Sequence, residues 1–141
     1  MKRIILATLV VFVIWVIIDL VIHGIVLNPV YDASREIWRS EASYRVYIMY
    51  LARLFAAFSF VLVYALFFGK RGVGTGLWYG FLLGFAAGFT LGYGTFAMIP
   101  IPSIVALTWF LVTLFEGVVA GAIIGGMFPV GPWRGVTSPA E

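Results

Sequence analysis

The third apolar stretch of the chain reads GVGTGLWYGFLLGFAAGFTLGYG over residues 72–94. A glycine stands at every fourth position from Gly72 to Gly92, without a gap. Residues four apart share one face of an α-helix, so this spacing predicts a helix with one face of bare backbone. Such faces let membrane helices approach each other closely. We therefore expect close helix packing to organise the fold.

A matching series runs through the fourth apolar stretch, at Thr113 and at every fourth residue after it. Only a few residues around Pro100 and Pro102 separate the two stretches, so the two helices are expected to be antiparallel neighbours. Their small-residue faces are predicted to pack on each other. The predicted packing positions are Gly76, Gly80, Gly84, Gly88, Gly92, Gly117, Gly121 and Gly125.

The whole chain has the composition of a membrane protein. Of its 141 residues, 63% are hydrophobic and 11% charged, and the mean hydropathy is +1.09. Soluble domains have about a quarter of their residues charged. Four apolar runs, at 4–27, 47–68, 75–98 and 103–128, each reach the length of about 20 residues that a helix needs to cross a bilayer. The sequence predicts an all-α four-helix transmembrane bundle, with residues 1–141 as a single domain.

The basic residues indicate an orientation, because all those outside the spans and the first outer connection fall on one side of a four-span arrangement. By the positive-inside rule that side is the cytoplasm, so both termini are expected to be cytoplasmic, in a bacterial inner membrane. The residues concerned are Lys2, Arg3, Lys70, Arg71 and Arg134.

The connection between the first two runs, residues 31–45, is the longest segment outside the spans. Its acids and arginines alternate at helical spacing, as in Asp32 and Arg35, with Trp38 and other apolar residues between them. This pattern favours a short amphipathic helix on the outer membrane surface. The segment is either a neutral linker or a docking surface for another subunit.

Four ionisable residues lie inside the spans: Asp19, His23, Arg53 and Glu116. At a rise of 1.5 Å per residue, Asp19 and Arg53 lie about 12 and about 10 Å from the outer boundary, His23 about 6 Å and Glu116 about 20 Å. We expect Asp19 and Arg53 to form an ion pair with the other two nearby. Such a cluster is either a structural lock between helices or a proton or ion route.

Aromatic residues follow the glycines of the third run one position later, at Phe81, Phe85, Phe89 and Tyr93. They either fill the space beside the close helix contact or wall a groove for a lipid or a flat apolar cofactor, such as a quinone, carotenoid or porphyrin tail. The sequence does not choose between these alternatives.

Several function classes are disfavoured by the sequence. There is no cysteine and only one histidine, so disulfides, thiolate metal sites and bis-histidine haem are excluded. No nucleophile elbow, zinc-protease motif or phosphate-binding loop is present, so no enzyme is expected. The basic residues are too few and scattered for a nucleic-acid surface.

The segments GLWYGF (76–81) and FEGVVAG (115–121), together with the span arrangement, resemble the small four-span bacterial membrane proteins of unknown function. The turn NPVY (28–31) departs from the Trp-Tyr-Ser-Pro turn of one such family. The resemblance implies a topology and no activity.

Two hypotheses about function follow. The first is a non-catalytic membrane subunit, scaffold or accessory protein that packs through its Gly-rich helices in a larger membrane assembly or a homo-oligomer, in contact with lipid or an apolar cofactor. The second is a small oligomeric transporter or channel that uses the polar cluster.

Overall fold

The computed structural model describes residues 1–68 and 72–128. Four helical spans in these residues are long and apolar enough to cross a membrane: Lys2–Val26, Val46–Phe67, Val73–Met98 and Ser103–Met127. Each begins and ends within a few residues of a predicted run, and the described residues contain no strand. The all-α four-helix fold is therefore confirmed. Helices suit this environment because their backbone groups hydrogen-bond to each other, whereas hydrocarbon offers no hydrogen-bond partners.

The first and third spans each include a π-helical turn that the sequence patterns did not predict. Both turns contain glycine, and π-helical turns are frequent at functional sites. The elements in chain order are α1 (Lys2–Val21), η1 (Ile22–Val26), α2 (Asn28–Ala33), η2 (Arg35–Ile37), η3 (Glu41–Ser43), α3 (Val46–Phe67), α4 (Val73–Phe89), η4 (Thr90–Gly94), α5 (Thr95–Met98) and α6 (Ser103–Met127).

The connection expected to form one short helix is divided into three short elements, α2, η2 and η3. The Ser34 hydroxyl donates to the Val30 carbonyl at 2.8 Å and accepts from the Trp38 indole at 3.0 Å. Such local side-chain hydrogen bonds compete with a continuous helix. Asp32 and Arg35 form the expected pair at 2.9 Å. The apolar side of the segment folds onto Leu27 and the start of α6.

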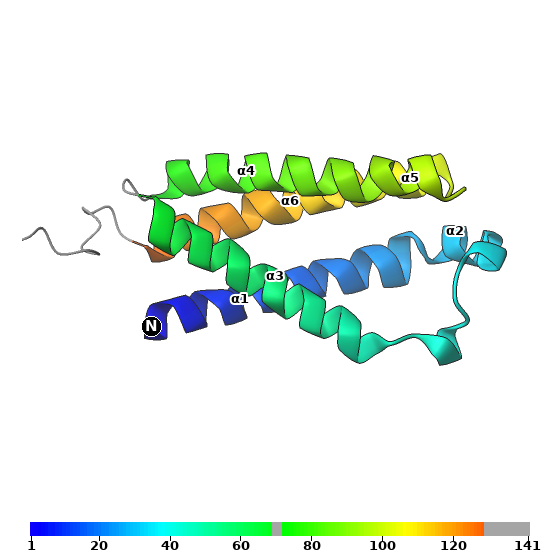
Figure 1. Ribbon diagram of the computed structural model, residues 1–141, viewed down its shortest axis with the longest axis horizontal. Helices are drawn as coiled ribbons and strands as arrows, with labels where there is room; N and C mark the ends of the chain where they lie inside the picture. The colour runs from blue at the N-terminus through cyan, green and yellow to red at the C-terminus, as the bar shows by residue number, and fades with distance from the viewer. Residues whose placement is uncertain (69–71, 129–141) are drawn as a thin grey trace, which may run out of the picture.

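The helices form two pairs (Figure 1). α4 and α6 run side by side along their length, whereas α1 and α3 cross each other. The N-terminus, the end of α3, the start of α4 and the end of α6 lie at one end of the bundle, here called the termini end. The segment from α2 to η3 lies at the opposite end, here called the loop end. Towards the loop end, α3 diverges from α4 and α6 (Figure 1).

Glycines bring α4 and α6 into backbone contact. A methyl group at Gly80 would overlap the carbonyl oxygen of Gly117, and one at Gly76 would overlap that of Gly121. A methyl group at Gly84 would lie 3.0 Å from the Leu114 Cα. The structure places all the ladder glycines at this contact: Gly76, Gly80, Gly84, Gly88 and Gly92 on the third span, and Gly117, Gly121 and Gly125 on α6.

The larger buried core occupies the half of the bundle towards the termini end. Aromatic hydroxyls tie α3 to its neighbours there. Tyr64 donates to the Gly72 carbonyl at 2.9 Å, and Tyr79 donates to the Phe60 carbonyl at 2.7 Å. The members of this core are Ala7, Val11, Trp15, Ala57, Phe60, Val61, Tyr64, Ala65, Tyr79, Ala120, Ile124 and Phe128. Asp19, His23, Arg53 and Glu116 lie above it, towards the loop end.

Candidate functional site: an intramembrane polar cluster

Arg53 of α3 and Asp19 of α1 form a direct ion pair. The Arg53 Nε donates to Asp19 Oδ2 at 2.7 Å, and Nη2 donates to the same oxygen. The helical rise predicts that these residues lie at one depth, and the structure has them in contact. The two side chains are 27% and 28% exposed. Inside a bilayer, that exposed fraction faces either hydrocarbon or another molecule.

Glu116 of α6 contacts the same guanidinium from a third helix. Arg53 Nη2 donates to Oε1 and Arg53 Nη1 lies against Oε2, both at 3.3 Å. The Glu116 side chain is only 2% exposed. One guanidinium therefore stands between two carboxyl groups, one from α1 and one from α6. This arrangement links three of the four spans, those of α1, α3 and α6.

His23 extends the cluster towards the loop end. Its Nε2 lies 3.8 Å from Asp19 Oδ1, one helical turn away. Its Nδ1 lies 2.7 Å from the Tyr31 hydroxyl of α2, and the oxygen of that hydroxyl accepts a hydrogen bond from the Trp109 indole at 2.9 Å. The π-helical turn η1 contains His23 and lies between Asp19 and α2. A continuous row of polar contacts thus runs from Trp109 and Tyr31 to Glu116.

The contacts of Tyr31 favour one placement of the proton on His23. Burial raises the pKa of the Tyr31 phenol to about 12, so its hydroxyl stays protonated at physiological pH. The oxygen accepts from Trp109, and its hydrogen is left for His23 Nδ1. Nδ1 is then the acceptor, which places the imidazole hydrogen on Nε2, facing Asp19. The imidazole in this arrangement is neutral.

Trp15 lies beneath the cluster on the side of the termini end. Its indole donates to the backbone carbonyl of Glu116 at 3.0 Å. Its ring centroid lies 5.5 Å from Arg53 Cζ, within the range of a cation–π contact. Trp15 also belongs to the buried core below. The row of polar contacts therefore ends at Glu116 and Trp15, above a packed apolar core.

Sequence reasoning found four of the cluster's residues and missed Tyr31, Trp109 and Trp15. Tyr31 lies outside the spans, so a search for polar groups within them passes over it. Trp109 and Trp15 are usual residues of an apolar helix and carry no charge to draw attention. The depth of Trp109 could have indicated its place in the cluster. It lies six residues into the fourth span, about 9 Å by helical rise, close to the level of His23.

The aromatic residues beside the glycine ladder form a ridge rather than a groove. Phe81, Phe85 and Phe89 are 38%, 46% and 51% exposed. Successive rings lie about one helical turn apart, at 6.2 and 6.1 Å, and Phe85 and Phe89 both contact Phe110 of α6. The rings therefore cover the edge of the α4–α6 contact and face outwards from it.

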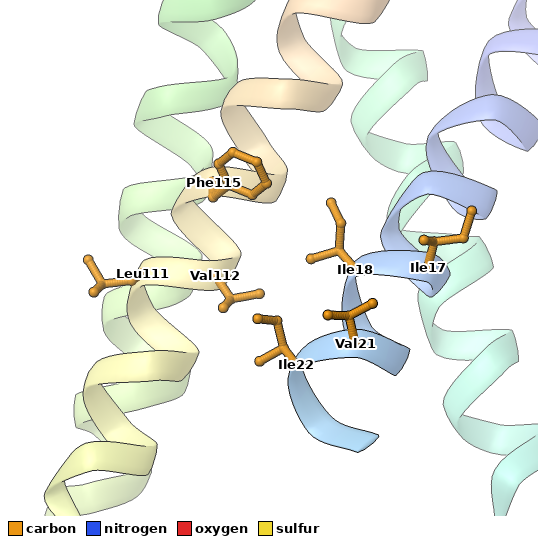
Figure 2. Close-up of a pocket in the computed structure, with 7 residues that line it drawn as sticks. All are labelled: Ile17, Ile18, Val21, Ile22, Leu111, Val112 and Phe115. Carbon is orange, nitrogen blue, oxygen red and sulfur yellow. The ribbon is translucent and has the colours of Figure 1, made fainter. Parts of the chain in front are cut away.

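An open apolar groove of about 420 Å³ lies between α1 and α6 in the half of the bundle towards the loop end (Figure 2). It contains none of the polar residues of the cluster. The side chains that line it are Ile17, Ile18, Val21, Ile22, Leu111, Val112 and Phe115. Figure 2 shows these side chains pointing into the space between the two helices.

No family model, curated protein or solved structure matches the chain. The resemblance to small four-span bacterial membrane proteins stays a prediction from the sequence. Within the described residues, no group of three or more His, Asp or Glu side chains is arranged to hold a metal ion. The chemistry of the site therefore has to be argued from its own residues: one guanidinium, two carboxyls and a neutral imidazole.

Proposed function

We propose that the protein is a non-catalytic membrane subunit whose second span meets another subunit along its half towards the loop end. The observation that carries this proposal is the exposed fraction of Asp19 and Arg53 at hydrocarbon depth. Ionised groups in spans are costly in contact with lipid and normally face protein or water. Lipid chains offer no hydrogen bonds to these groups, so we expect their exposed part to contact the surface of another protein.

The packing of α3 supports the same proposal. Over residues 46–56 no side chain is buried, and only Arg53 and Leu54 are half buried. The first buried residue of the helix is Ala57. Large side chains such as Tyr47 and Phe55, each 65% exposed, surround this part of the helix. Half of a span thus makes little contact with its own bundle while carrying an arginine.

The glycine ladder does not supply the partner surface. Its glycines are in contact with the facing helix of the same chain, as at Gly80 and Gly117. A methyl group there would meet backbone, so no second partner can use that face. The aromatic ridge at Phe81, Phe85 and Phe89 is instead the part of this pair that would contact lipid or an apolar cofactor.

The proposed location is a bacterial cytoplasmic membrane with the termini end inside. Lys2 and Arg3 lie at that end, where the positive-inside rule places basic residues. Lys70, Arg71 and Arg134, which entered the same argument, lie outside the described residues. Reporter fusions after Met127 and within the α2–η3 segment test the orientation; an active periplasmic reporter after Met127 would reverse it.

Site-specific photo-crosslinking tests the subunit proposal. Phe55 of α3 and Leu82 of α4 are 65% and 60% exposed, and each lies nine residues from the start of its helix. We expect a photoreactive residue at Phe55 to give an adduct of one defined mass in native membranes, and the matched residue at Leu82 to give none. Mass spectrometry of the adduct then separates a second copy from another protein. Equal yields at both positions, or none at Phe55, would overturn the proposal.

A small transporter or channel is the second candidate, favoured by the row of polar contacts from Tyr31 to Glu116. In this conformation the row of polar contacts does not continue to the termini end, because the core below Trp15 is packed with apolar side chains. Transport would then require the two helix pairs to move apart. Liposome flux decides the matter: Asp19→Asn and Glu116→Gln should abolish any flux that uses the cluster, whereas unchanged flux in both removes the cluster from the mechanism.

A further inference from the structure

The charges of the cluster do not balance. Asp19 and Glu116 bring two carboxyl groups to one guanidinium, that of Arg53. His23 is neutral in the arrangement in which Tyr31 accepts from Trp109 and donates to His23 Nδ1. With both carboxyls ionised, the cluster would carry one uncompensated negative charge at membrane depth, where desolvation makes such a charge expensive. One further positive charge is required.

The geometry leaves no place for a metal or organic cation between the carboxyls. The guanidinium itself fills that space: it bonds to Asp19 on one edge and faces both oxygens of Glu116 at 3.3 Å on the other. A proton needs no volume of its own. The missing charge is therefore supplied at a carboxyl oxygen.

The two carboxyls differ in burial and in their distance from the guanidinium. Asp19 holds the shorter contact, 2.7 Å to Nε, and has the exposed side chain. Glu116 holds the longer contacts and is almost fully buried, at 2% exposed. The helix α4, which faces α6 along its length, brings no Asp, Glu, Lys, Arg or His near Glu116 over Val73–Phe89. The hydroxyl of its Tyr79 donates to the Phe60 carbonyl instead. Glu116 is the better site for a proton.

We propose that the Asp19–Arg53–Glu116 cluster is a proton-binding site that holds one proton per chain on Glu116 and exchanges it with the loop end through His23 and Tyr31. The contacts trace this route as far as Asp19, and the proton passes from there to Glu116 when the Arg53 guanidinium moves from between the two carboxyls. Tyr31 lies at the loop end, its hydroxyl reaches His23 Nδ1, and His23 Nε2 faces Asp19 beside the guanidinium. Below Glu116 the core is apolar, so the site opens to one side only.

The experiment is infrared spectroscopy of the full chain in lipid nanodiscs at pH about 8. Exposed carboxyls are ionised at that pH, so a band from a protonated carboxyl reports a buried one. We expect one protonated carboxyl for each carboxyl group of the cluster that exceeds the number of guanidinium groups. Wild type should show one such band, Glu116→Gln none and Arg53→Met two. The control Glu36→Gln, outside the cluster, should keep the wild-type band.

Asp19→Asn gives the sharpest result. It leaves Glu116 in place, yet the band should vanish, because Glu116 then ionises to pair with Arg53. A purely structural carboxyl would keep its band in this variant. Persistence of the band in Asp19→Asn overturns the proposal. So does absence of the band in wild type, which would mean that a charged His23 balances Asp19 instead.

Access from the loop end has its own readout. Transfer of the nanodiscs into D₂O shifts the band as the carboxyl proton exchanges. We expect Tyr31→Phe, which removes the hydroxyl contact to His23, to keep the band and to slow this shift. An unchanged rate would refute the route while the band count still tests the site. The wild-type band and its D₂O shift require no variant, so the test holds even where a variant fails to fold.

Discussion

The two helix pairs of this bundle are held together by opposite means. α4 and α6 meet through glycines, with backbone against backbone along much of the membrane thickness. α1 and α3 cross, pack closely only towards the termini end, and meet towards the loop end through charged groups. A pair whose helices meet mostly through backbone has little room to change. The pair joined by a guanidinium has exposed surface and a site that can gain or lose a charge.

The largest expected effect comes from filling the glycine contact. In Gly80→Ala the new methyl group would overlap the Gly117 carbonyl, and since neither backbone can rotate away, the helices must separate. We expect a loss of about 3 kcal/mol in the free energy of unfolding, at the upper end of overpacking costs.

The matched control is Gly74→Ala, on the same helix, where a methyl group would meet nothing within 4 Å. It should be neutral or stabilising by up to about 1 kcal/mol, because alanine favours the helix over glycine. Steric-trapping measurements of both variants in bicelles compare them. Equal stability of the two variants would show that the ladder is not a close contact.

Removing the charge that joins the other pair should have the next largest effect. Arg53→Met leaves Asp19 and Glu116 without their common partner. We expect a loss of about 2 kcal/mol in the free energy of unfolding. This is less than the roughly 3–5 kcal/mol that breaking a buried pair costs in a soluble protein, because the carboxyls can take up protons. Arg35→Met, at the exposed pair with Asp32, should cost less than about 0.5 kcal/mol. Chemical unfolding in mixed micelles ranks the two, and the reverse order would contradict this description of the cluster.

Trp15 connects the pairs, so its replacement tests the contact between them. Trp15→Phe keeps an aromatic ring in the core and removes the hydrogen bond to the Glu116 carbonyl. A loss of about 1 kcal/mol is expected for one such bond. Trp78→Phe, at a position 68% exposed, should change stability far less. Thermal unfolding followed by circular dichroism distinguishes the variants; similar melting temperatures would show that the bond is unimportant.

A stabilising change should come from Thr8. Its hydroxyl is buried in α1 and has no hydrogen-bond partner among the described residues. Thr8→Val replaces the hydroxyl with a methyl group of similar size. The expected gain is about 1 kcal/mol, the lower end of the desolvation cost of an unpaired polar group. A loss of stability in the same unfolding assay would indicate that the hydroxyl is bonded after all.

The fold was largely predictable because its determinants are local. Hydropathy marks each span, and a glycine every four residues marks the face that packs, so α4 and α6 follow from the sequence alone. Asp19 and Arg53 could be brought together by counting depth, since antiparallel spans share a common boundary. These inferences need only the rise of a helix and the thickness of a bilayer.

The remainder depends on tertiary contacts that no local pattern records. Tyr31 reaches His23 only because a π-helical turn and the short helix α2 carry it back over the bundle. Ser34 divides the predicted surface helix by bonding to Val30 and Trp38. The divergence of α3 is likewise a property of the whole bundle, because its sequence is as apolar as that of the other spans.

The proposed subunit would cover the divergent half of α3 in the membrane. Spin labels at Phe55→Cys and Leu82→Cys test this proposal directly, and the chain has no cysteine of its own to interfere. In polymer-extracted native membrane discs, we expect the label at position 55 to be immobile and shielded from oxygen, and the label at position 82 to be mobile and oxygen-accessible. Equal oxygen accessibility at the two positions would contradict the proposal.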